Sequence, residues 1–133
     1  MLAATTAAVA ANSLHKGDVL ATARVAGIQA AKQASNLLPM SHPVLVGNVH
    51  VNFSIADTFI EVEASVDAVD RTGVEMEALV AVTVAALTVY DMCKSVDRTM
   101  TIEDVTIWEK SGGRSGTWRR EEVAADRDVQ PEG

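Results

Sequence analysis

Residues 74–94, VEMEALVAVTVAALTVYDMCK, are the feature that most constrains how this chain can fold. The stretch carries no charge between Glu77 and Asp91, so a helix formed here is apolar almost all the way round. A helix that is hydrophobic on all faces is normally buried on all faces. Since a single domain of 133 residues covers one side of such a helix with its own sheet, we expect a second subunit to cover the other side.

The composition fits one compact domain. Hydrophobic residues make up 48% of the chain and aromatic residues only 4%, which predicts a core of Val, Ala, Ile and Leu. The net charge of -7 argues against binding nucleic acid or anionic membranes, because both need a basic face. The one cysteine, Cys93, cannot form an internal disulfide, and the longest apolar run, residues 78–89, is too short to span a bilayer. We expect a cytoplasmic protein.

Two helices are expected before the first strand. Residues 1–12 are made of good helix formers, and Asp18 is the expected N-cap of a second helix that ends near Leu38. The second helix is rich in Ala and Gly, so another backbone can approach it closely. Pro39 and Pro43 follow, and because proline disfavours the α region in the residue before it, we expect His42 to be held extended.

A hairpin and the long helix come next. Apolar and polar residues alternate through residues 49–55 and again through 60–66, on either side of Asp57-Thr58, which predicts two strands joined by a tight turn. Thr72 and Glu75 have the spacing of a capping box at the start of the long helix.

The C-terminal part is expected to add one strand. We predict this strand over residues 101–108, a flexible basic loop over 110–116, and a disordered, mildly acidic tail over 119–133 after a single domain of residues 1–118. The order from Asp18 onward is then helix, strand, strand, helix, strand. This α+β order is one initial strand short of the βαββαβ ferredoxin-like pattern.

The polar residues of the long helix stand at its two ends. Glu77 and Asp91 are fourteen positions apart (91 − 77), so they face within roughly 40° of each other but lie about 21 Å apart along the axis. Asp91 and Lys94, at i and i+3, share one face. If these groups serve one pocket, we expect an isologous two-fold contact that places one end of the helix beside the opposite end of its mate.

Each of these residues also has a purely structural interpretation. Glu75 could serve only as the acid of the capping box, and Asp91 with Lys94 could be a solvated ion pair. His42 could be only a loop residue, and Lys110 with Arg114 could be only a solubilising run. Lys16-Gly17-Asp18 could be only a turn followed by a helix cap. Taken one at a time, none of these residues is specific for a function.

Four stretches taken in order resemble the MoaC family, the cyclic pyranopterin monophosphate synthases of molybdenum cofactor biosynthesis: KGDVLATARVAGIQAAK, LLPMSHP, RTGVEMEALVAVTVAALTVYDMCKSVDR and EKSGGRSG. The resemblance covers residues 1–118 and is strongest at 16–43 and 71–116. It implies a ferredoxin-like α+β subunit, with helices on one face of an antiparallel sheet. It also implies a homohexamer built as a trimer of dimers, with active sites at subunit interfaces.

The resemblance implies a lyase that converts 3′,8-cyclo-7,8-dihydroguanosine 5′-triphosphate to cyclic pyranopterin monophosphate and releases pyrophosphate. Carried over residue by residue, the catalytic groups fall on Asp91, Lys94 and Lys16. The substrate-binding positions fall on Met40, Ser41, His42, Glu75, Met76, Glu77 and Lys110. Ser41 replaces the cysteine usual in the family. No metal-ligand set is implied, although Mg²⁺ could accompany the triphosphate.

The types of these residues suit the chemistry. Lysines can stabilise the charge that develops as pyrophosphate leaves. Rebuilding a purine-derived ring needs several proton transfers, which Asp91 beside Lys94 could perform if burial moves their pKa values toward neutrality. We therefore expect Asp91 and Lys94 to be the reacting pair, with Lys16 as a phosphate ligand or a second acid or base.

One departure from the family concerns the N-terminal segment. Family members carry an additional sheet strand with an arginine near the active site, whereas residues 1–15 here resemble the helix that follows it. The first strand of a ferredoxin-like sheet is central, so its absence would expose neighbouring edges. Either the true reading frame begins upstream, or the chain is a divergent paralogue, catalytically weak or silent, that binds a pterin or nucleotide or assembles with an intact subunit. An unrelated ferredoxin-like regulatory domain would require the Lys, His, Glu and Asp constellation to be a coincidence.

Overall fold

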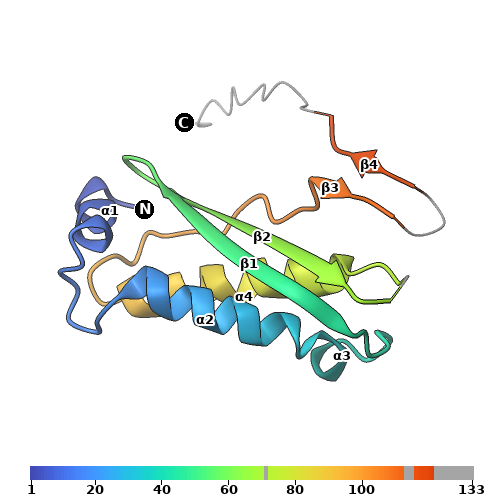
Figure 1. Ribbon diagram of the computed structural model, residues 1–133. Helices are drawn as coiled ribbons and strands as arrows, with labels where there is room; N and C mark the ends of the chain where they lie inside the picture. Colours follow the sequence, from blue (N-terminus) through green and yellow to red (C-terminus); the bar gives the residue numbers. More distant parts are fainter. Residues whose placement is uncertain (71, 113–115, 122–133) are drawn as a thin grey trace.

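The computed structural model describes residues 1–70, 72–112 and 116–121, and Figure 1 shows their arrangement. The helices are α1 (Ala3–Ala10), α2 (Val19–Ala31), α3 (Ala34–Leu37) and α4 (Glu75–Cys93), and the strands are β1 (Val46–Ile55), β2 (Ile60–Ala68), β3 (Glu109–Lys110) and β4 (Trp118–Arg119). Helices α2 and α4 lie side by side, and the β1–β2 hairpin crosses them on one face (Figure 1). The expected α+β class, with antiparallel strands and helices packed against them, is confirmed.

Helix α2 begins where the sequence predicts and ends earlier. The Asp18 carboxylate accepts a hydrogen bond from the Ala21 N–H at 3.0 Å, so the predicted N-cap is confirmed. The prediction of one helix as far as Leu38 was wrong. The N–H groups of Lys32 and Gln33 donate to carbonyls three residues earlier, and this tighter turn separates α2 from the short α3.

The predicted hairpin is confirmed. Strands β1 and β2 pair antiparallel, from Ile55 opposite Ile60 beside the turn to Val46 opposite Ala68 at the open end. The strict alternation of burial along β2 matches the alternation of apolar and polar residues in the sequence. Val51, at the centre of β1, is fully buried against the helices. The apolar face of the hairpin therefore closes the core over α2 and α4.

Small residues set how closely the two long helices pack. A Cβ added at Gly27 of α2 would lie 3.0 Å from the Ala81 carbonyl oxygen and 3.2 Å from the Ala85 Cβ of α4. Both alanines are fully buried. The close backbone approach that the Ala- and Gly-rich stretch predicts is therefore confirmed, and its partner is α4.

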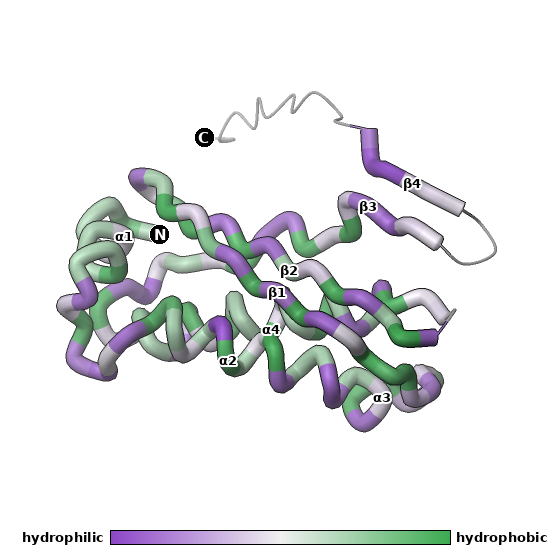
Figure 2. The backbone as a smooth tube through the Cα atoms, in the orientation of Figure 1, coloured by the Kyte–Doolittle hydropathy of each residue, from purple (hydrophilic) through white to green (hydrophobic). Residues whose placement is uncertain are grey.

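Within the described chain, α4 is covered along one side. Its buried residues recur at helical spacing and form one stripe: Glu77, Ala81, Ala85, Val89, Met92 and Cys93. On the other side Met76 and Leu87 are exposed, and Val25 of α2 is exposed as well. Figure 2 shows hydrophobic residues along both helices. By length and composition alone, α4 is long and apolar enough to cross a membrane, and in this structure it packs against α2 and the hairpin.

The C-terminal part differs from the prediction. Residues 101–108 were expected to form a strand, and this was wrong, because the structure assigns no regular strand to these described residues. Asp104 has a φ of 55°, in the left-handed region, which interrupts an extended run. Glu109 pairs instead with Arg119, and Lys110 with Trp118, in the small β3–β4 hairpin.

The expected tail and basic loop are described only in part. Arg119, the expected first residue of the tail, lies in β4, and the chain is described as far as Glu121. Residues 122–133 of the expected tail lie outside the described residues, as does Arg114 at the centre of the expected basic loop.

Candidate functional site

The C-terminal end of α4 carries three of the predicted site residues together. The Lys94 Nζ lies 2.7 Å from Oδ1 of Asp91, one helical turn away, so the predicted i, i+3 pair is confirmed. The Lys16 Nζ donates a 3.1 Å hydrogen bond to the Asp91 backbone carbonyl and lies 4.0 Å from the Asp91 Oδ2. The fold therefore brings Lys16 from the turn before α2 to the same place.

The electrostatics of this cluster oppose one prediction. The hydrogen bond from Lys94 and then the charge of Lys16 hold the pKa of Asp91 below its ordinary value. The hydrogen bond to Asp91 and the charge of that carboxylate raise the pKa of Lys94. Both shifts lead away from neutrality, because the side chains are half exposed and each stabilises the charged form of the other. At neutral pH the pair is therefore a carboxylate beside an ammonium group.

A shallow groove runs from these charges onto the uncovered side of α4. It has a volume of about 440 Å³ and is lined by Val84, Leu87, Thr88, Tyr90, Asp91 and Lys94. One end of the groove is charged, and the rest is apolar apart from the hydroxyl-bearing side chains of Thr88 and Tyr90. This combination suits a ligand that has a phosphate or polar ring at one end and a flat apolar surface.

The N-terminal end of α4 carries a second ion pair. The Lys110 Nζ lies 2.6 Å from the Glu75 Oε1, and this hydrogen bond, followed by the backbone N–H of Glu75, lowers the pKa of the carboxyl group. The predicted capping box was wrong. Helix α4 begins at Glu75 with the hydrocarbon side chain of Val74 at the N-cap, so Thr72 stands outside the helix and donates its N–H to Asp70. The Glu75 carboxylate binds Lys110 instead of closing a capping box with Thr72.

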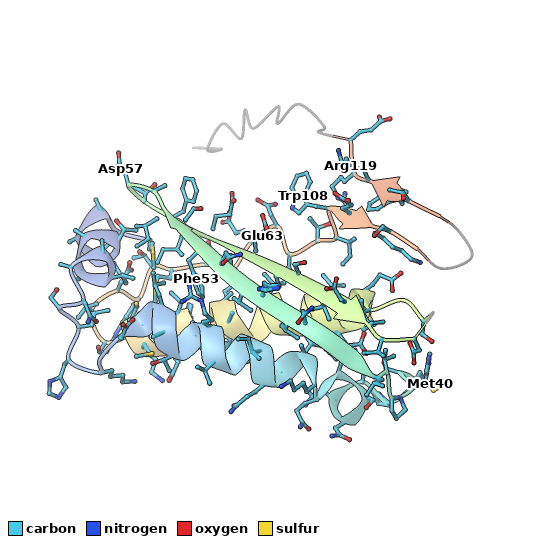
Figure 3. All side chains as sticks on the ribbon, in the orientation of Figure 1. Met40, Phe53, Asp57, Glu63, Trp108 and Arg119 are labelled. Carbon is cyan, nitrogen blue, oxygen red and sulfur yellow. The ribbon has the colours of Figure 1, made fainter. Side chains whose placement is uncertain are left out.

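The other predicted substrate-binding residues lie near this second end. Glu77 is 4% exposed, and the neighbouring Met76 is exposed on the outer side of α4. Met40 is almost fully exposed in the segment after α3, where Ser41 is partly buried and His42 is exposed. Figure 3 places Met40 at the α3 end of the molecule, and α3 contacts α4.

The predicted site is thus divided into two clusters within one chain. Lys16, Asp91 and Lys94 form the first, and Glu75 with Lys110 anchors the second. Glu75 and Asp91 are sixteen residues apart on one helix (91 − 75), which corresponds to about 24 Å along its axis. One small substrate cannot touch both clusters of the same chain.

Sequence reasoning missed one buried carboxylate, that of Asp97. Its Oδ2 accepts hydrogen bonds from the Leu2 N–H at 2.8 Å and the Thr5 hydroxyl at 2.9 Å, and its Oδ1 accepts from the N–H and hydroxyl of Thr99. These bonds, led by that from Leu2, hold the pKa of Asp97 well below its ordinary value. The spacing of Asp97 and Thr99 in the sequence indicates a local turn. The hydrogen bonds that Asp97 accepts from Leu2 and Thr5 join distant parts of the chain, so no local sequence pattern indicates them.

The structure offers no preformed metal centre in the part of the chain it describes. Among these residues, no group of three or more His, Cys, Asp or Glu side chains is arranged to hold a metal ion. Mg²⁺ commonly binds through one or two carboxylates together with the phosphates of a substrate. Its presence with a triphosphate therefore stays a prediction about the substrate complex.

Comparison with known proteins covers most of the chain. A model of the MoaC family matches residues 1–113. The chain is 62% identical over 112 residues to the cyclic pyranopterin monophosphate synthase of Thermomicrobium roseum, across 83% of this chain and 68% of that protein. The protein of the same name from Desulfitobacterium hafniense is 52% identical over 123 residues, across 92% of this chain and 76% of its own length.

A third relative has a similar degree of identity. Cyclic pyranopterin monophosphate synthase 2 of Mycobacterium tuberculosis is 54% identical over 114 residues, across 86% of this chain and 68% of its own. Such identity over most of both chains excludes a chance resemblance, so the interpretation as an unrelated regulatory domain was wrong. The chain belongs to the MoaC family.

Proposed function

We propose that this protein is a cyclic pyranopterin monophosphate synthase, a lyase of molybdenum cofactor biosynthesis. It converts 3′,8-cyclo-7,8-dihydroguanosine 5′-triphosphate to cyclic pyranopterin monophosphate and pyrophosphate. The observation that carries the proposal is the cluster of Lys16, Asp91 and Lys94, three residues that the family resemblance assigns to catalysis and that meet at one end of α4. The relatives of this printed name from Thermomicrobium roseum and Desulfitobacterium hafniense are 62% and 52% identical to this chain over the aligned residues.

The protonation states of the cluster support separate roles for its members. Asp91, with its lowered pKa, is the base that accepts protons from ring nitrogens or hydroxyls during rearrangement. Lys94, with its raised pKa, is an ammonium that donates a proton or stabilises negative charge. Lys16 is the second cation, able to bind a phosphate oxygen or to act as a further acid.

Formation of the cyclic phosphate also suits these groups. A hydroxyl oxygen of the substrate forms a new bond to the phosphorus nearest the sugar, and the bond from that phosphorus to pyrophosphate breaks. The hydroxyl proton passes to a base, and the leaving pyrophosphate carries away the bonding electrons. Lysine ammonium groups lower the cost of the charge that develops on the phosphate oxygens.

We assign the substrate-binding role to Met40, Ser41, His42, Glu75, Met76, Glu77 and Lys110, supplied by a second subunit. The support is geometric, because the two clusters lie about 24 Å apart along one helix and the apolar side of α4 between them is exposed. In an isologous two-fold contact, the beginning of one α4 lies beside the end of its mate. Such a contact joins both clusters around one substrate and covers Leu87.

The remaining proposals concern assembly and compartment. We infer a homohexamer made of three such dimers, with a ferredoxin-like subunit in a single domain of residues 1–118. The order of α2, β1, β2 and α4 supports this subunit fold. A cytoplasmic location is supported by the buried, unpaired thiol of Cys93, which suits a reducing compartment.

A single-turnover assay tests the proposed function. The chain is mixed in excess with the cyclised GTP intermediate, and pyrophosphate and the pterin product are followed together. We expect both products to form in equal amounts. An oligomer that binds the intermediate and releases neither product would overturn the enzyme assignment and favour the catalytically silent paralogue.

A further inference from the structure

Asp97 joins the N-terminal helix to the end of α4. Its carboxylate is 2% exposed and lies between Thr99, on its own loop, and the first turn of α1. The Asp97 N–H donates to the Cys93 carbonyl at 3.0 Å, so its backbone continues the last turn of α4. Figure 1 shows α1 at the end of the molecule where α4 ends. The carboxylate is therefore fixed to α4 on one side and to α1 on the other.

The Asp97 carboxylate supplies a hydrogen-bond acceptor at the start of helix α1. Leu2 occupies the N-cap position, and its hydrocarbon side chain has no oxygen to accept from the first turn. Asp97 accepts the Leu2 N–H and the Thr5 hydroxyl instead, although it lies more than ninety residues away along the chain. The negative charge also stands at the positive end of the helix dipole.

The position of α1 determines where Lys16 can reach. Only five residues separate the last residue of α1, Ala10, from Lys16. The connection is tightly turned, with Asn12 and Gly17 at positive φ and the Gly17 N–H bonded to the Leu14 carbonyl. The Lys16 ammonium then bonds the carbonyl of Asp91, six residues before Asp97. A short, turned connection carries displacement of α1 to Lys16.

We propose that Asp97 is a positioning residue, whose hydrogen bonds to Leu2 and Thr5 hold α1 so that Lys16 stays over Asp91. Asp97 need not touch the substrate, because it acts through Lys16. The effect on catalysis rests on the proposed function, whereas the effect on the position of Lys16 does not. The exposed ion pair of Asp91 and Lys94 lies within one helix and is independent of this link.

Matched variants at Thr5 test the link without removing the buried carboxylate. Thr5→Val keeps the shape of the side chain and loses the donor, while Thr5→Ser keeps the donor. Asp97→Asn is the reciprocal change. The position of Lys16 is read from its rate of acetylation by acetic anhydride, measured by mass spectrometry relative to the exposed Lys32 at the end of α2.

We expect the Lys16-to-Lys32 labelling ratio to rise about two- to tenfold in Thr5→Val and Asp97→Asn, the factor that corresponds to the loss of one hydrogen bond. Thr5→Ser should keep the wild-type ratio. An unchanged ratio in both other variants overturns the proposal. The same conclusion holds if the labelling rates of Lys16 and Lys32 rise equally, because the ratio is then unchanged and the whole fold has loosened.

Turnover provides a second readout that separates the two proposals. In an active wild type, we expect Thr5→Val to lower kcat by a similar factor and Thr5→Ser to restore it. A wild type without turnover overturns the proposed function alone, since the labelling ratio still decides whether Asp97 positions Lys16.

Discussion

The ammonium group of Lys110 lies 2.6 Å from the carboxylate of Glu75, and this ion pair ties β3 to the first turn of α4. Each side chain is about two-thirds covered, so the pair is shielded from solvent more than a surface salt bridge. Gly73 leaves the space for it, because a Cβ at that position would collide with the Glu75 carboxylate. A side chain at position 73 would therefore displace the Glu75 carboxylate from its present place.

Gly73→Ala should weaken this ion pair. The added methyl group displaces the Glu75 carboxylate from Lys110, and we expect the free energy of unfolding to fall by about 0.5 to 1 kcal/mol, the value of a partly exposed pair. Urea denaturation of Gly73→Ala, Glu75→Ala and the double variant measures the coupling. Strictly additive losses would show that Gly73 has no bearing on Glu75.

Asp91→Asn should abolish most turnover while preserving the fold. The amide keeps the shape of the side chain but cannot accept a proton as a carboxylate does, so we expect kcat to fall at least about a hundredfold. Glu63→Gln is the control, since Glu63 is an exposed carboxylate on the outer face of the hairpin (Figure 3). Retained turnover in Asp91→Asn, measured by pyrophosphate release, would remove Asp91 from the mechanism.

Acid should destabilise the chain partly through Asp97. Its pKa in the folded chain lies below the ordinary 3.8, so at low pH the unfolded chain binds more protons and stability rises with pH. The stability that Asp97 contributes is complete at pH values above its ordinary pKa of 3.8. This stability is lost as the pH falls through the pKa of Asp97 in the folded chain. Urea denaturation from pH 7 to pH 3, at one protomer concentration, should show a shallower acid loss for Asp97→Asn. Equal slopes for both proteins would contradict this.

Leu87→Lys should weaken the proposed dimer. Leu87 is 54% exposed on the uncovered side of α4, and a charge at a buried subunit contact leaves an ammonium group without a partner. We expect light scattering to show an oligomer for the wild type and smaller species for the variant. Phe59→Lys, at a similarly exposed apolar residue by the hairpin turn, is the control. A monomeric wild type would refute the interfacial site.

Gly27→Ala should separate α2 from α4. The new methyl group meets the Ala81 carbonyl oxygen at 3.0 Å, a backbone atom that cannot rotate away. Overpacking of this kind costs about 1 to 3 kcal/mol, against a gain in helix propensity of about 1 kcal/mol. We expect a net loss of stability in urea denaturation and a larger loss for Gly27→Val. A stabilised Gly27→Ala would mean that the helices can move apart freely.

Local patterns in the sequence predicted the elements that depend on neighbouring residues. The alternation through residues 49–55 and 60–66 predicted the hairpin and its faces, since side chains alternate along a strand whatever the rest of the fold does. The Asp18 cap and the Asp91 to Lys94 pair also follow from spacing on one helix. Each of these features is decided within a few residues of chain.

Elements whose outcome depends on tertiary contacts were predicted less well. Thr72 and Glu75 have the spacing of a capping box, but the Glu75 carboxylate binds Lys110 of β3 instead. Residues 101–108 were predicted to form a strand, yet a strand needs a hydrogen-bonded partner, and these described residues have no regular ladder. The local pattern states what a segment can form, and its neighbours in space decide what it does form.

The candidate site shows the same division. The sequence by itself determined the family, through motifs shared with MoaC proteins, and with it the candidate residues for the chemistry. It also placed Asp91 and Lys94 on one helical face. Only the tertiary structure decided that Lys16 joins them and that Asp97 caps α1. It also placed Glu75 and Lys110 at the far end of α4. The physical reason is chain separation: contacts between residues far apart in sequence form only after the core of α2, α4 and the hairpin has fixed the backbone.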